Sequence, residues 1–143
     1  MKKLLVIISV LTFVACGSKD SKQASMEVPL TADGKVDTTK LPKFEFTQDA
    51  YDFGTIKQGE KVSYAFIFKN TGSTPLIISS ASASCGCTVP SYPEDPIQPG
   101  AESKIDVVFD SNGKMGFQTK TITLVANTIP NTKVLYLRGE VTE

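Results

Sequence analysis

The sequence contains no histidine and no tryptophan, has only three cysteines among 143 residues, and balances 15 basic against 15 acidic side chains. Histidine is the commonest general base near neutral pH and the commonest metal ligand. Its absence excludes Ser-His-Asp and Cys-His catalysis, together with every zinc site built on histidine. A net charge of zero supplies no basic face to neutralise phosphates, so the composition predicts no nucleic-acid partner.

The N-terminal apolar run is too short to be a membrane span. It covers residues 4–15, which is twelve residues, whereas a spanning helix needs about 20. Lys2 and Lys3 precede it, and a basic start followed by an apolar run of this length is typical of a secretory signal peptide. We therefore predict a signal peptide over residues 1–15.

The end of this run points to lipid attachment. Phe13-Val14-Ala15-Cys16 resembles the bacterial lipobox, with Phe13 where leucine is usual. Small residues before the cysteine admit the peptidase, and the Cys16 thiol accepts a diacylglyceryl group. Several acyl chains, such as palmitate, hold a protein to a bilayer far more firmly than one, since each buried CH₂ contributes about 0.8 kcal/mol. We predict that Cys16 is lipidated and that the membrane is a partner; ordinary cleavage leaving a free thiol is the alternative.

The stretch that follows has the composition of a linker. Residues 16–42 are rich in Ser, Lys, Thr and Asp, and their few apolar residues follow neither a helical nor a strand period. This predicts a flexible tether. Removal of Lys2 and Lys3 leaves 13 basic against 15 acidic residues, and no acidic run follows Cys16. We expect attachment in the bacterial cell envelope, at the outer membrane and facing the periplasm.

Residues 43–143 have the pattern of an all-β domain. Residues 62–69 alternate apolar and polar positions, as half-buried strands do, and similar runs recur between turn-forming residues. About seven short strands without an amphipathic helix predict an immunoglobulin-like antiparallel β-sandwich. The phase of the alternation slips between Phe117 and Ile122, where we expect a β-bulge. The predicted core comprises Phe53, Val62, Tyr64, Phe66, Phe68, Ile78, Ile105, Val107, Phe109, Ile122, Leu124, Leu135 and Leu137.

Several separated motifs in this region occur in the order of a known family. They are Asp52-Phe53-Gly54-Thr55-Ile56, Gly59-Glu60, Phe68-Lys69-Asn70-Thr71-Gly72, Pro75-Leu76, Cys85-Gly86-Cys87-Thr88, Pro99-Gly100 and Gly139. Together they resemble the bacterial domain-of-unknown-function 1573 family over about residues 44–142. That family resembles immunoglobulin-like domains related to the major sperm protein fold. The resemblance implies a secreted or lipid-anchored β-domain of undefined role, with no catalytic residues to assign.

Cys85-Gly86-Cys87 is the most informative local motif. In one interpretation it is a structural turn, since Gly86 permits a sharp bend. In a second, the two thiols form a strained, easily reduced disulfide. In a third, two thiolates bind a soft metal such as Cu(I). Zinc fits least, because it requires four ligands and histidine is absent.

These observations favour a lipid-anchored envelope protein whose immunoglobulin-like domain binds a partner protein as an adaptor, through loops or edge strands. We expect no enzymatic activity and no cofactor. The alternatives are a thiol redox or soft-metal protein acting through Cys85 and Cys87, and a purely structural envelope protein.

Overall fold

Strands make up the folded part of the protein. The computed structural model describes residues 30–35 and 37–143, and none of the helices in this part is long and apolar enough to cross a membrane. The elements are η1 (Thr38–Lys40), β1 (Phe44–Phe46), β2 (Ala50–Lys57), β3 (Lys61–Asn70), β4 (Ile78–Ala83), β5 (Cys87–Ser91), β6 (Glu102–Asp110), β7 (Gly116–Ala126) and β8 (Thr132–Thr142).

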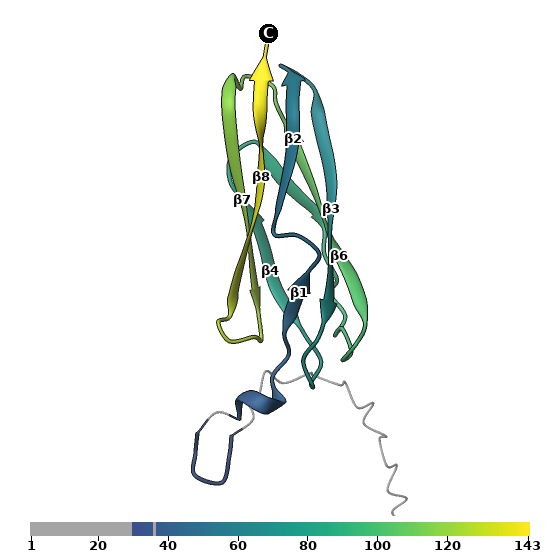
Figure 1. The fold of residues 1–143 in the computed structure, drawn as a ribbon, viewed down its shortest axis with the longest axis vertical. Coiled ribbons are helices and arrows are strands. Elements are labelled where there is room, and N and C mark those ends of the chain that lie inside the picture. The colour runs from purple at the N-terminus through teal and green to yellow at the C-terminus, as the bar shows by residue number, and fades with distance from the viewer. Residues whose placement is uncertain (1–29, 36) are drawn as a thin grey trace, which may run out of the picture.

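Two four-stranded sheets pack face to face, with their strands along the long axis of the molecule (Figure 1). One sheet has the order β1-β3-β6-β5 and the other β2-β8-β7-β4. The predicted immunoglobulin-like sandwich of about seven strands is confirmed, and the described part of the chain forms eight strands in its two sheets. The pair β2–β8 is parallel, whereas the other pairs are antiparallel.

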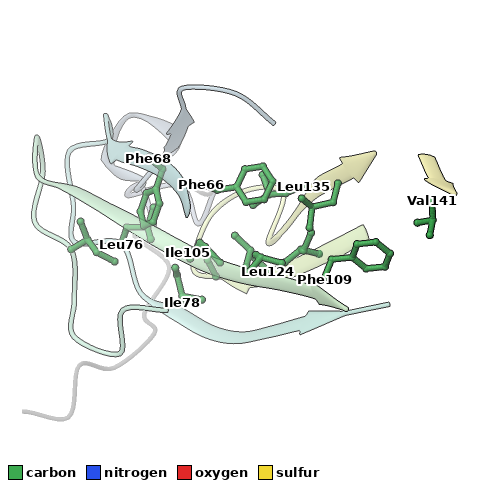
Figure 2. Packing of buried hydrophobic residues seen from close by; sticks show 14 residues of the cluster. Phe66, Phe68, Leu76, Ile78, Ile105, Phe109, Leu124, Leu135 and Val141 are labelled. Atoms are coloured by element: carbon green, nitrogen blue, oxygen red, sulfur yellow. The ribbon is translucent and has the colours of Figure 1, made fainter. Parts of the chain in front are cut away.

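The core lies between the sheets, as Figure 2 shows. Ten of the thirteen predicted core residues are buried, and the other three (Phe53, Val62 and Tyr64) are partly buried against the same cluster. The prediction omitted Leu76, Ile97, Ala126 and Val141. Leu76 and Ile97 pair in an isolated bridge outside the strands, where no alternating pattern exists to reveal them.

The predicted bulge in β7 is wrong. The register of β7 with β8 runs without interruption from Gly116 to Val125. The phase slips because Phe117 lies on the outer face of the sheet, where 87% of its surface is exposed. Lys120, in contrast, has the inward parity of Ile122 and Leu124, and its ammonium group lies 5.6 Å from the centroid of the Phe109 ring. The apolar residues therefore change from the outward to the inward face along β7, while the pairing of the strand stays regular.

A buried asparagine organises the end of the domain where the chain enters. The Asn70 side chain is fully buried. Its amide donates to the carbonyls of Thr74 (2.8 Å) and Ile97 (2.9 Å), and its oxygen accepts from the backbone N–H groups of Lys43 (3.2 Å) and Gly72 (3.0 Å). One polar side chain thereby provides hydrogen-bond partners for backbone groups of two loops and of the segment that enters the domain. Its own polar atoms are also paired, as buried polar groups require.

Residues that the composition places in the tether also contact the domain here. The hydroxyl of Ser73 donates to the carbonyl of Thr39 (2.8 Å), and that of Thr74 donates to the carbonyl of Lys40 (3.1 Å). The chain therefore enters at the end of the sandwich opposite the C-terminus (Figure 1).

Candidate functional site

The candidate site is centred on the turn that joins β4 to β5. The backbone N–H of Cys87 donates to the carbonyl of Ser84 at 3.0 Å, which closes a four-residue turn around Cys85 and Gly86. Gly86 has a φ of +89°, a backbone conformation that residues other than glycine rarely adopt at this turn position. The Cys-Gly-Cys motif thus forms a turn, which carries the chain from one sheet to the other.

The turn separates the environments of the two cysteines. Cys85 is exposed, whereas Cys87 is partly buried against the hydrophobic core. Burial raises the pKa of the Cys87 thiol to about 11, although the positive charge of Lys120 acts in the opposite direction. Cys87 is therefore protonated at neutral pH, and a protonated thiol is a poor nucleophile and a poor metal ligand.

Both cysteines are free thiols in this structure, and in the described part of the chain no three His, Cys, Asp or Glu residues gather as a metal site. The disulfide and Cu(I) interpretations stay predictions. The third cysteine, Cys16, lies outside the described residues, and so does its predicted lipid.

Two lysines that the sequence reasoning missed lie close to the turn. The Cε atom of Lys114 is 3.1 Å from the position that a Cβ atom on Gly86 would occupy. The ammonium group of Lys120 lies 5.6 Å from the centroid of the Phe109 ring, and Phe109 is the register partner of Cys87. Among the described residues, neither lysine forms a salt bridge. No local signal could have found them, because both are far from the cysteines in the sequence.

The strand that leads into the turn is an edge of its sheet. In the order β2-β8-β7-β4, strand β4 pairs only with β7. Ser84 and Thr121 are a hydrogen-bonded pair, because the N–H of Ser84 donates to the carbonyl of Thr121 at 2.9 Å. Hydrogen-bonded and non-hydrogen-bonded pairs alternate along an antiparallel ladder. The backbone groups of Ala81 and Ala83 therefore point away from β7, toward the open edge.

Nothing in the described part of the chain covers that edge by hydrogen bonding. No backbone hydrogen bond outside the β4–β7 ladder involves Ala81 or Ala83. Their side chains are small and pack against the core, while Ser80 and Ser82 are exposed. The site is thus an open strand edge that ends at an exposed thiol with two lysines close by.

The architecture is that of an immunoglobulin-like β-sandwich. A family model described as "Protein of unknown function (DUF1573)" matches residues 44–141. The chain belongs to this family, as its motifs predicted. A comparison with the curated proteins finds no match.

Solved structures support the fold. A protein of unknown function from Porphyromonas gingivalis W83 has a TM-score of 0.61 at 18% identity, over 73% of this chain and 49% of its own. The secreted serine protease VesC from Vibrio cholerae has a TM-score of 0.55 at 10% identity, over 71% of this chain and 23% of its own. The ASH/PapD-like domain 7 of human CEP192 has a TM-score of 0.52 at 15% identity, over 83% and 96%. The chain thus spans about half of the Porphyromonas protein and about a quarter of the protease, and at these identities the likeness concerns the fold alone.

Proposed function

We propose that this protein is a lipid-anchored adaptor of the bacterial cell envelope, with Cys16 carrying the lipid and the immunoglobulin-like domain binding a partner protein without catalysis or cofactor. The sequence around Cys16 supports the anchor, and the absence of histidine supports a role by contact. The observation that carries the binding role is the open β4 edge, since exposed edges are templates for pairing with another chain.

The anchor and the binding surface occupy different parts of the domain in this proposal. The tether enters at the end held by Asn70, whereas β4 runs along the side of the sandwich. A lipid at the outer membrane, facing the periplasm, would then leave the edge accessible to a second envelope protein.

The anchor is tested by intact-mass measurement and membrane fractionation of wild type, Cys16→Ser and Cys85→Ser. We expect the wild type and Cys85→Ser to carry the mass of the acyl chains and to sediment with membranes, and Cys16→Ser to lose both properties. Cys85→Ser is the matched control because it also removes one thiol. An acyl mass absent from all three proteins would refute the anchor.

The adaptor role is tested by crosslinking in intact cells, with photoreactive residues introduced singly at exposed positions on each sheet and each loop. We expect one envelope protein to be recovered reproducibly, and the double variant Cys85→Ser/Cys87→Ser to recover it equally well. A background with no reproducible partner at any position would refute the role and favour a purely structural protein.

A second candidate, thiol redox or soft-metal binding, is favoured by one observation: the exposed Cys85 lies in the same turn as a second thiol, with Lys114 beside that turn. Alkylation of protein from cells under non-reducing conditions separates the alternatives. A peptide lighter by two hydrogen masses supports a disulfide, and two alkylated thiols exclude it. Copper retained by wild type but lost in the double serine variant supports the metal.

A further inference from the structure

The two sheets present four edges to solvent, and three of them are poor templates for an added strand. β1 is three residues long. The register of β2 shifts between Asp52 and Thr55, and that of β5 shifts between Thr88 and Ser91. Bulges and short edges are the means by which proteins prevent unwanted pairing.

Strand β4 lacks these protections over most of its length. Its register shift lies near its start, between Ile78 and Ser80, and four consecutive residues from Ser80 to Ala83 then pair regularly with β7. This is the longest uninterrupted stretch among the four edges. It carries neither charge nor proline, and its largest side chain is a serine, so that another backbone can approach closely.

The charge distribution adds a preference at one end of β4. The strand runs toward the Cys-Gly-Cys turn, near which Lys114 and Lys120 lie without a salt bridge among the described residues. A strand added antiparallel to β4 places its N-terminal end at this turn. An acidic side chain there would meet two positive charges that form no salt bridge within the described part of the chain.

From this geometry we infer that β4 receives an extended segment of a partner protein, which pairs antiparallel with Ala81 and Ala83 through its backbone. The segment is uncharged over about four residues, and an acidic residue lies toward its N-terminal end. This inference rests on the proposed adaptor function and names its binding edge and the chemistry of its partner. A second copy of the chain is a less suitable occupant, because pairing β4 with itself leaves Lys114 and Lys120 without acidic partners.

The probe is the acetylated, amidated peptide Asp-Thr-Ile-Thr-Leu-Val, which copies residues 120–125 with aspartate in place of Lys120. This segment already pairs with β4 on its other side. Nuclear magnetic resonance of the ¹⁵N-labelled domain reports binding residue by residue. We expect the amide signals of Ala81 and Ala83 to shift and their hydrogen exchange to slow about tenfold at saturation, while the β2 and β5 edges stay unchanged.

Two variants and two control peptides test the geometry. Ala81→Pro removes an N–H that points to the open edge and not to β7, so we expect about tenfold weaker binding by a folded protein. Ala83→Pro is the second variant, should the first not fold. A peptide N-methylated at its central residues should not bind, and the peptide with lysine restored at its first position should bind several-fold more weakly.

Three results would overturn the inference: peptide-induced shifts confined to another edge, equal binding by the N-methylated peptide, or a dimer of the free protein that Ala81→Pro dissociates. The last result would assign β4 to a second copy. If crosslinking still recovers one envelope partner from other surfaces, the adaptor function stands and only the assignment to β4 fails. If no partner is recovered either, both fail.

Discussion

The two long sides of the sandwich are closed in different ways. On the side of β2 and β3, aromatic rings from opposite sheets meet: Tyr51 stacks on Tyr64 with centroids 3.8 Å apart, and Phe53 stacks on Phe109 at 5.4 Å. On the side of β4 and β5, Ile78 at the start of β4 is buried in the core, and the partly buried residues of the two strands that pack against it are Ala81, Ala83 and Cys87. The aromatic side is filled by large, directional contacts, whereas the small-residue side leaves a strand edge available. The comparison indicates that large aromatic contacts close one side, whereas the other side has smaller contacts and ends in the edge strand β4.

The largest effect should follow from removing an aromatic ring. Phe53→Ala eliminates the contact with Phe109 and opens a space between the sheets, and we expect a loss of about 3 kcal/mol in the free energy of unfolding. Ala83→Gly, on the small-residue side, should cost about 1 kcal/mol. Urea denaturation followed by circular dichroism measures both. Similar losses for the two variants would contradict the assigned difference between the sides.

Gly139 tests how tightly the aromatic side is packed. A Cβ atom at this position would lie within 2.2 Å of Cε2 of Phe53 and 2.6 Å of the Gly54 carbonyl oxygen. We therefore expect Gly139→Ala to destabilise the protein by about 2 kcal/mol. In a double-mutant cycle with Phe53→Ala, part of this cost should disappear, because the ring that collides is gone. If the two losses in the free energy of unfolding were strictly additive, the Phe53 ring would not be what limits the space at Gly139.

Two proline substitutions in β4, made separately, test the orientation of its backbone. Ser82 lies at a position that hydrogen-bonds with β7, so Ser82→Pro should cost about 2 kcal/mol. Ala81→Pro removes an N–H that points to the open edge, and it should cost less than about 1 kcal/mol. Thermal unfolding by calorimetry compares them. Equal destabilisation would refute the alternation derived from the Ser84–Thr121 hydrogen bond.

A further prediction concerns Cys87 and pH. Burial raises the pKa of this thiol from an ordinary value of 9.0 to about 11, so the unfolded chain loses its proton first as the pH rises. The contribution of this thiol to stability is complete below about pH 9 and declines between pH 9 and 11. Chemical denaturation across this range should show the decline in wild type and Cys85→Ser and not in Cys87→Ser. If stability declined equally in Cys87→Ser, the pH dependence would be due to other titratable groups.

Most of the fold could be predicted, because the alternation of apolar and polar residues that specifies a half-buried strand lies within a short stretch of sequence. Alternation along a half-buried strand specifies which residues enter the core, as Phe66, Phe68 and Ile105 illustrate. The prediction was incomplete where alternation stops: Leu76 and Ile97 are buried from loops, and Phe117 faces outward near the start of β7. The strand β5 was not predicted either, because Gly86 and Pro90 interrupt any regular pattern around it.

The candidate site was predictable only in part. The motif identified Cys85 and Cys87, and glycine between them indicated a turn. The different burial of the two thiols was not predictable, since it depends on the packing of Cys87 against the core. The positions of Lys114 and Lys120 depend on which strands lie beside the turn.

The sequence by itself determined the class of fold, the identity of most core residues and the exclusion of histidine chemistry, because composition and local periodicity are properties of the chain. Only the tertiary structure decided that β4 is an edge, that its Ala81 and Ala83 backbone groups face outward, and that two lysines lie near the turn after it. These features depend on hydrogen bonding between strands far apart in the sequence. Pairing partners and register emerge when the sheets assemble, and no short stretch of residues specifies them.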